Sequence, residues 1–182
     1  VVPLRFELGS RPDVDQVVDA IMGDESLAAA VVVHSETSTG ATADVQAIAE
    51  RTRDRSCLLL IDAISSLGAT RLETDAWELD VVVTGSQKAL MCPPGLAFAS
   101  VSERAWERSA RATSPRFYFD WKRTRAAQQK GGQSPFTPAI TPGPSRNVHC
   151  RIAIRDSPVT PSACSCAPVA PAKCCCRVTT ER

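Results

Sequence analysis

Apolar side chains recur at helical spacing in two stretches of the chain, residues 12–22 and residues 42–53. In the first stretch one face carries Val14, Val17, Val18 and Ile21, and in the second it carries Val45, Ile48 and Ala49. The spacing predicts an amphipathic helix in each stretch. A third helix is predicted from Ser102, a good N-cap residue, to about Arg111.

Short runs rich in apolar residues lie before, between and after these helices. They predict strands at residues 2–7, 28–33, 57–61, 80–83 and 96–99. The run at 28–33 has no polar alternation, which is typical of a strand buried on both faces. Strands that alternate with helices predict an α/β fold, a mostly parallel sheet with helices on both faces.

The composition changes near residue 140. Residues 141–182 contain no Leu and no aromatic residue, but six Pro and six Cys. A segment with so little apolar surface to bury cannot offset the entropy of ordering it. We therefore expect residues 1–140 to hold the folded domain and residues 141–182 to be a tail that is either disordered or read in a shifted frame.

The tail has two explanations. Cys174–Cys176 can be encoded by a repeated TGC, which reads as Leu or Ala codons in the other frames, so a shifted frame would explain the change. The alternative is a genuine metal-binding tail that uses Cys164, Cys166 and Cys174–Cys176, with His149 as the one nearby imidazole. The spacing fits no standard zinc module.

Charge and termini exclude several classes of protein. The formal net charge is only +1, so no strong field favours a nucleic acid or a membrane surface. No apolar run reaches the roughly 18 residues that a membrane span needs. The first residues lack the layout of a signal peptide, which leads us to expect a cytoplasmic protein. The chain does not start with Met, and we expect it to begin inside a longer protein.

Three polar segments each follow a predicted strand. Residues 34–40 (HSETSTG) follow the strand at 28–33, Asp62 follows 57–61, and the segment ending in Lys88 follows 80–83. The carboxyl ends of parallel strands meet at one edge of a sheet, where α/β proteins bind ligands.

Each of the three segments also has an ordinary explanation. Asp62 could cap a helix or lie in a loop, and Lys88 could be a surface residue in a turn. Residues 34–40 could lead into the next helix, with Thr39 or Thr42 as its cap. The spacing of Gly85 and Lys88 does not match a phosphate-binding P-loop.

Together the three segments supply what pyridoxal 5'-phosphate (PLP) needs. Its aldehyde needs an amine, its pyridine nitrogen an anion, and its phenolic oxygen a hydrogen-bond donor. A lysine at a strand end in a partly dry site can attack carbonyl groups. We therefore hypothesise that PLP binds at this edge.

The same segments resemble the alanine–glyoxylate and serine–pyruvate aminotransferases of class V. Residues 34–40, 62–68 (DAISSLG) and 85–90 (GSQKAL), followed by Pro93-Pro94-Gly95, occur in that family's order, with 26 positions from Asp62 to Lys88. Residues 117–120 and 134–140 resemble later segments of the family. The resemblance covers roughly residues 1–140.

The resemblance implies a fold, an activity and roles for individual residues. The fold is the large domain of the PLP transferases, similar to aspartate aminotransferase. The activity is transfer of an amino group from alanine or serine to glyoxylate or pyruvate. The implied contacts with PLP are the Schiff base at Lys88, the pyridinium partner Asp62, the ring neighbour Ile64, the phenolic-oxygen partner Thr37 and the phosphate contact Gln87. Thr137 or Gln133 would reach the phosphate of a neighbouring subunit, which implies a homodimer.

Cysteine desulfurases are the nearest alternative. They usually have His before the lysine and Asn near the position of Thr37, whereas this chain has Gln87 and Thr37.

Family members are also longer than this chain. We do not recognise here three features of the family: the glycine-rich phosphate loop, the aromatic residue that stacks on the ring, and the arginine that holds the substrate carboxylate. We therefore expect the chain as written to have no catalytic activity. A non-catalytic fragment with a cysteine-rich metal-binding tail stays an alternative.

Overall fold

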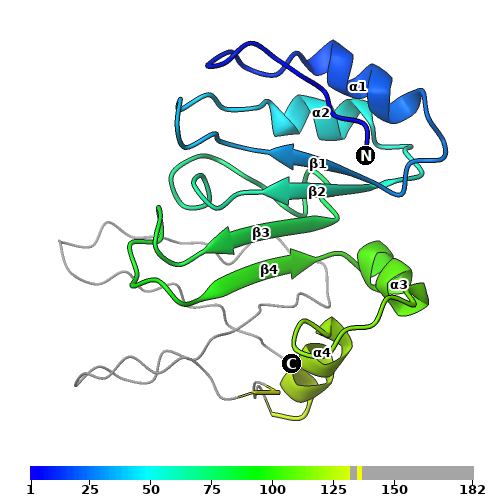
Figure 1. Cartoon of the computed structure of the whole chain (residues 1–182), viewed down its shortest axis with the longest axis vertical. Coiled ribbons are helices and arrows are strands. Elements are labelled where there is room, and N and C mark those ends of the chain that lie inside the picture. The colour runs from blue at the N-terminus through cyan, green and yellow to red at the C-terminus, as the bar shows by residue number, and fades with distance from the viewer. Residues whose placement is uncertain (132–134, 137–182) are drawn as a thin grey trace.

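The computed structural model describes residues 1–131 and 135–136. The elements are α1 (Val14–Met22), β1 (Ala29–Val33), α2 (Val45–Arg51), β2 (Leu58–Asp62), β3 (Val81–Gly85), β4 (Ala97–Val101), α3 (Glu103–Arg111) and α4 (Trp121–Gln129). The four strands form one sheet in the order β1-β2-β3-β4, as Figure 1 shows. β1, β2 and β3 are parallel, and β4 runs antiparallel to β3. The mostly parallel sheet predicted from the sequence is confirmed.

Helices α1 and α2 lie side by side and cover one face of the sheet. Their buried residues, except Val18, pack with the sheet residues Leu59, Ile61 and Val82 in the larger of the two apolar clusters of the described residues. Each helix begins at an aspartate: Asp13 accepts a hydrogen bond from the Gln16 N–H, and Asp44 accepts one from the Ala47 N–H. Neither Thr39 nor Thr42 is therefore the cap, and α2 starts later than the predicted residue 42.

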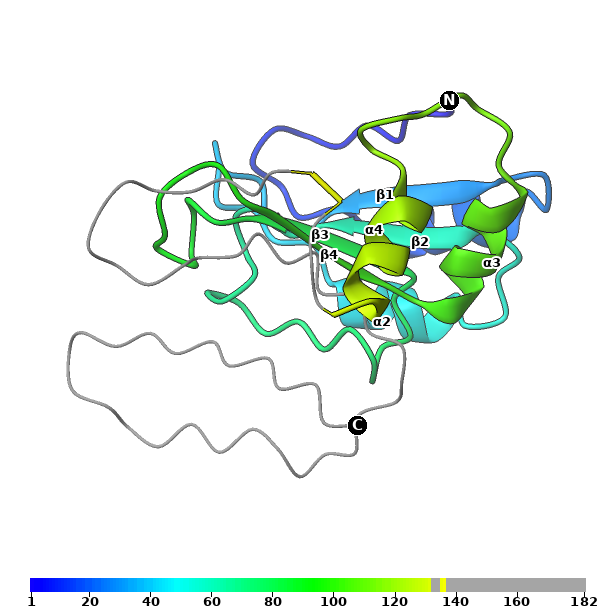
Figure 2. The same ribbon diagram turned by 90° about the horizontal axis from the view of Figure 1, so that it is seen from below.

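The other face is covered mainly near β3 and β4. There Val81, Ala99 and Val101 pack against Ala105 and Trp106 of α3. Trp121 of α4 meets Trp106 edge-on, with 6.0 Å between the ring centroids. Figure 1 shows α3 and α4 together near β4, away from β1, and Figure 2 shows the same two helices from below.

Two expectations about the first strands are wrong. Residues 1–7 form no strand. No strand of the described sheet pairs with them, and an unpaired strand is unstable in water. β1 is not buried on both faces either, because Val31 is 71% exposed and Val33 46%. Among the described residues, no helix covers that side of β1.

Within the described residues, none of the helices has the length and the apolar character that crossing a membrane requires.

Candidate active site

The loops that follow β1, β2 and β3 meet at one edge of the sheet. The three arrowheads point the same way in Figure 1. We name the loops by their strands: the β1 loop is residues 34–44, the β2 loop residues 63–70 and the β3 loop residues 86–96. Every predicted site residue within the described part lies on these loops or at the end of β2.

Hydrogen bonds tie the β1 loop to the β2 loop. The backbone N–H of His34 donates to the carbonyl of Asp62, at 2.9 Å. The Nδ1 atom of His34 lies 2.8 Å from the hydroxyl of Ser66, and both side chains are buried. The hydroxyls of Thr37 and Ser65 are also hydrogen-bonded, at the solvent-exposed side of the loops. The two loops therefore hold Thr37 close to the segment that carries Asp62 and Ile64.

Asp62 is the last residue of β2 and is partly exposed. It lies in register with Val33 on one side and Val83 on the other. Its Oδ1 atom accepts a hydrogen bond from the Ile64 N–H at 2.9 Å. No other hydrogen bond to this carboxylate is found within the described residues. The second oxygen is thus open to a ligand, and the side chain of Ile64 is 37% exposed beside it.

The β3 loop carries Lys88, and the strand before it, β3, is joined to the β2 loop by two hydrogen bonds. The hydroxyl of Thr84 donates to the carbonyl of Ala63 at 3.2 Å, and the Ala63 N–H donates to the carbonyl of Val83 at 2.9 Å. Inside the loop, the buried Ser86 donates its hydroxyl to the Pro93 carbonyl at 2.6 Å. A buried anchor of this kind fixes both ends of the loop.

Lys88 and Gln87 are both exposed on the β3 loop. Gln87 folds back over Gly85, where an added Cβ would lie 3.0 Å from its Oε1 atom. The partly dry surroundings expected for the lysine are not provided by the described residues. What the fold does provide is an accessible amine on the same edge as Asp62 and Thr37.

Gly68 sets the packing of the β2 loop against the β3 loop. Its φ is +98°, and an added Cβ would lie 3.3 Å from Leu90 Cδ2. We expect Gly68→Ala to lower the free energy of unfolding by about 1–2 kcal/mol, because L-residues resist this conformation. Gly9→Ala is the matched control, since Gly9 has φ +83° but open space around it.

Urea unfolding would measure the stability of both glycine variants, and titration with PLP would measure cofactor affinity. Both variants should lose stability, but only Gly68→Ala should also weaken PLP binding, because only that change disturbs the contact with the β3 loop. Equal affinity in the two variants would show that the Gly68–Leu90 contact has no influence on the site.

A buried charge network lies at the opposite end of β3. Asp80, 2% exposed, accepts hydrogen bonds from Arg55, from Arg104, from the Ser102 hydroxyl and from the Leu59 N–H, at 2.6–3.0 Å. Burial by itself raises the pKa of Asp80. The hydrogen bonds from Arg104 and Leu59 and the charges of Arg104 and Arg55 outweigh that effect, so its pKa lies below the ordinary value. Sequence reasoning missed this network, because it saw Asp80 only as the start of a strand.

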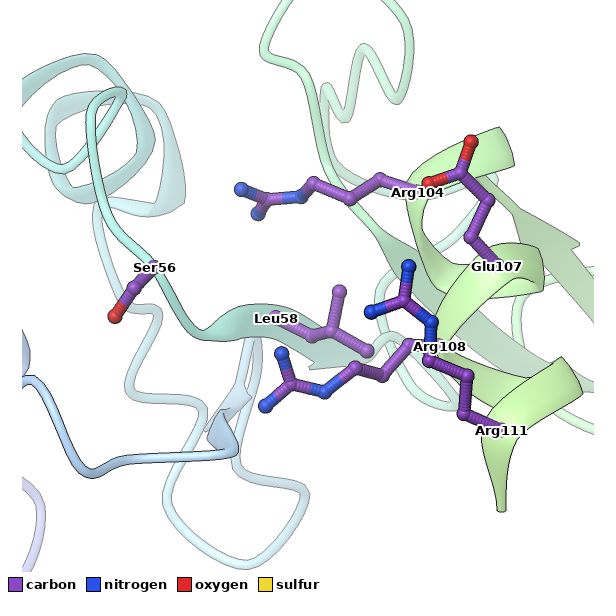
Figure 3. Close-up of a pocket in the computed structure, with 6 residues that line it drawn as sticks. All are labelled: Ser56, Leu58, Arg104, Glu107, Arg108 and Arg111. Carbon is purple, nitrogen blue, oxygen red and sulfur yellow. The ribbon is translucent and has the colours of Figure 1, made fainter.

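A shallow hollow of about 100 Å³ adjoins that network. It is lined by Ser56, Leu58, Arg104, Glu107, Arg108 and Arg111. Figure 3 shows Arg108 and Arg111 of α3 reaching toward Leu58 and Arg104 extending past it toward the segment that carries Ser56, while the carboxylate of Glu107 points away from Leu58. The hollow lies on the α3 side of the sheet at the amino end of β2, so it is separate from the edge that carries Lys88.

Two predicted residues, Gln133 and Thr137, lie outside the described part of the chain. The segment before them forms an exposed aromatic cluster. Phe117, Tyr118 and Phe119 are all largely exposed, and Tyr118 stacks on Phe136 with 4.7 Å between the ring centroids. The expected tail, residues 141–182, and the thiols in it also lie outside the described residues.

The fold is α/β, and the three predicted segments lie at the carboxyl ends of its parallel strands. The chain belongs to the aminotransferase class-V family, whose model matches residues 1–118. Members of this family are PLP-dependent enzymes. The family predicted from the three sequence segments is thereby confirmed.

Several curated relatives match the chain. The small subunit of a soluble hydrogenase from Synechococcus sp. (strain PCC 6716) is 48% identical over 62% of this chain and 29% of its own length. The serine–glyoxylate aminotransferase of Methylorubrum extorquens is 32% identical over 77% of this chain and 37% of its own length. The chain thus spans about a third of the length of the curated relatives it matches.

Solved structures show the same fold. An aspartate aminotransferase of subgroup IV from Thermus thermophilus is 39% identical, with a TM-score of 0.61 over 74% of this chain and 36% of that chain. The pyridoxamine–pyruvate aminotransferase of Mesorhizobium loti is 28% identical, with a TM-score of 0.66 over 75% of this chain and 36% of that chain. These similarities confirm the predicted fold, part of the large domain of the PLP transferases.

Proposed function

We propose that Lys88, Asp62 and Thr37 hold PLP at the carboxyl edge of the sheet. In this proposal the whole protein is an aminotransferase that moves an amino group from alanine or serine to glyoxylate or pyruvate. One observation carries the proposal. Hydrogen bonds join the β1 loop to the β2 loop and the β2 loop to strand β3, so the three strand ends bring an amine, a carboxylate and a hydroxyl to the same accessible edge.

The groups at this edge fit the chemistry of PLP. Lys88 is exposed and can reach an aldehyde in solvent. One oxygen of Asp62 has no hydrogen bond within the described residues and can accept one from a protonated pyridine nitrogen. The Thr37 hydroxyl lies at the surface with Ser65, where it can donate to a phenolic oxygen. The apolar side chain of Ile64 is exposed beside Asp62, as a ring neighbour should be.

Each residue has a distinct role in the proposal. PLP, when bound, supplies an electron sink for the substrate carbon. Lys88 attaches the cofactor and then carries the proton between that carbon and the cofactor. Asp62 keeps the ring nitrogen protonated by its negative charge, and Ile64 covers one face of the ring. Thr37 donates to the phenolic oxygen, and Gln87 contacts the phosphate.

The substrates are inferred from the names of relatives. Serine–glyoxylate aminotransferases of Methylorubrum extorquens and Arabidopsis thaliana are 32% and 37% identical to this chain. Two relatives of higher identity are named as soluble hydrogenase subunits. We favour amino transfer because a lysine amine, a carboxylate and a hydroxyl at a strand edge are the groups that PLP chemistry uses.

The second candidate function is a cysteine desulfurase. Gln87 before the lysine and Thr37 favour the aminotransferase over this alternative. The two functions differ in their products, so the whole protein should be assayed with alanine or serine plus glyoxylate or pyruvate, and separately with cysteine. Amino transfer would support the proposal. Sulfide release from cysteine as the main activity would refute it.

Assembly as a homodimer also belongs to the proposal. The resemblance implies that Gln133 or Thr137 reaches a neighbouring subunit, and both residues lie outside the described part. Sedimentation of the whole protein with and without PLP tests this directly. A monomer that binds PLP with full affinity would refute the shared site.

Asp62→Asn should cut turnover in the whole protein by about two orders of magnitude, which corresponds to about 2.7 kcal/mol of barrier. The amide keeps the size of the side chain but loses the charge that holds the ring nitrogen protonated. Cofactor binding should persist, because Lys88 and Gln87 are unchanged. Steady-state kinetics and PLP titration would measure the two effects. Near-normal turnover in the variant would contradict the role of Asp62.

A further inference from the structure

We propose that His34 and Ser66 form a positioning pair for the cofactor site. Their buried hydrogen bond holds the β2 loop against the β1 loop. The β2 loop follows Asp62 and carries Ile64, and the β1 loop carries Thr37. Neither residue is assigned a contact with PLP. The inference rests on the proposed function, because the groups that the pair positions are the proposed cofactor contacts.

Burial makes this hydrogen bond an anchor. His34 is 3% exposed and Ser66 1%, and Nδ1 lies 2.8 Å from the hydroxyl oxygen across 32 positions of sequence. Water cannot easily replace either partner, so removing one leaves a buried polar group unpaired. The neighbouring hydrogen bond between Thr37 and Ser65 is exposed, and water competes with it. The exposed pair therefore depends on the buried pair for its geometry.

The backbone around Ser66 passes this restraint to the rest of the β2 loop. The Ser66 carbonyl accepts hydrogen bonds from the N–H groups of Ala69 and Thr70, at 2.9 and 2.8 Å. Its own N–H donates to the carbonyl of Ala63, at 3.2 Å. Ser66 is thus the centre of the turn that follows Asp62. A shift of Ser66 would move Ser65 and Ile64 on one side and Gly68 on the other.

The backbone of His34 anchors the other half of the pair. Its N–H donates to the Asp62 carbonyl and its carbonyl accepts from the Ala43 N–H, each at 2.9 Å. The backbone that carries the ring is therefore held on the β1 loop independently of Ser66. Burial lowers the pKa of His34, so the ring is neutral at neutral pH, with one nitrogen as donor and one as acceptor.

The test compares four variants of the full chain. Ser66→Ala removes the hydroxyl, and His34→Leu removes the ring nitrogen. His34→Asn keeps a polar atom near the position of Nδ1 and should restore the link. Thr52→Val is the matched control: Thr52, directly after α2, is also buried, and its hydroxyl donates to the Ile48 carbonyl at 2.7 Å, away from the edge. If the alanine variant fails to fold, Ser66→Cys takes its place as a milder change.

Three quantities would be measured: the free energy of unfolding, the PLP dissociation constant, and the wavelength and pH midpoint of the visible band of bound PLP. We expect Ser66→Ala and His34→Leu to weaken PLP binding about tenfold, or about 1.4 kcal/mol, and to shift the band. His34→Asn should recover most of the affinity and the wild-type spectrum. Thr52→Val should lose stability but bind PLP like the wild type.

The outcomes separate this inference from the proposed function. An unchanged dissociation constant and spectrum in Ser66→Ala would overturn the positioning role but would leave the proposed function untouched. The same would follow if Thr52→Val weakened PLP binding equally, since the effect would then be one of stability. A wild-type chain that gains no visible band, or that attaches PLP to a lysine other than Lys88, would overturn the proposed cofactor site and this inference with it.

Discussion

Replacing Lys88 with alanine is expected to abolish the visible absorbance that the chain gains with PLP. The band arises from a covalent link between the cofactor and an amine, and Lys88 is the lysine at the edge that carries Asp62 and Thr37. The two other lysines in the described part, Lys122 and Lys130, lie on or just after α4, beyond the β4 side of the sheet. Among the described residues, removal of Lys88 therefore leaves no lysine amine at the proposed site.

Three measurements check the lysine. Absorbance spectra are recorded with PLP for the wild type, for Lys88→Ala and for the control Lys122→Ala. Lys122 suits as the control, because its Nζ atom donates to the Ala110 carbonyl at 3.0 Å on α3. Borohydride reduction then fixes the cofactor to its lysine, and mass spectrometry of peptides identifies that lysine. A reducible band that persists in Lys88→Ala would disprove the assignment.

The arrangement of the three loops could be predicted from the sequence because it follows from topology. Apolar runs followed by polar segments indicate strands and their ends, and parallel strands place their carboxyl ends at one edge. Lys88 and Asp62 are 26 positions apart, yet Asp62 ends β2 and Lys88 follows β3, its parallel neighbour. Nothing beyond the strand pattern was needed to bring them to the same edge.

Contacts that depend on distant residues could not be predicted in this way. Periodicity identifies β1 as a strand, but it does not tell whether a helix covers Val31 and Val33. Helix α4 was missed because few of its side chains are apolar, and of its residues only Thr124 is buried. The pairing of His34 with Ser66 needs the register of β1 and β2, which fixes partners across 32 positions.

The Asp80 network shows the same limit at the other end of β3. The residue lies one position before the strand and binds Arg55 and Arg104, which are 25 and 24 positions away. An aspartate at the start of an apolar run gives no signal of such a network in one sequence. The two ends of β3 therefore have different functions: the amino end stabilises the sheet, and the carboxyl end carries the proposed chemistry.

Asp80→Asn is expected to lower the free energy of unfolding by about 3–5 kcal/mol, the cost of breaking a buried ion pair. Asparagine fills the same space as aspartate, so the loss of stability comes from the missing negative charge. Arg55 would keep a buried guanidinium with no carboxylate opposite, since its side chain is only 2% exposed. The matched control is Asp15→Asn, whose partner Arg51 is exposed, and exposed pairs contribute only about 0–1 kcal/mol.

The same network predicts the response of the folded chain to acid. The pKa of Asp80 is lowered in the folded state, so its charge contributes stability that is complete above the unfolded pKa of about 3.9. That contribution is lost as the pH falls from there through the lower folded pKa. Urea unfolding at a series of pH values should therefore show that the free energy of unfolding of the wild type declines in acid. The decline should be shallower in Asp80→Asn.

Because Asp80 and Lys88 lie at opposite ends of β3, PLP should bind the folded variant with unchanged affinity. A variant with full stability would contradict the structural role of Asp80, and one with weakened PLP binding would show that the two ends of β3 are coupled.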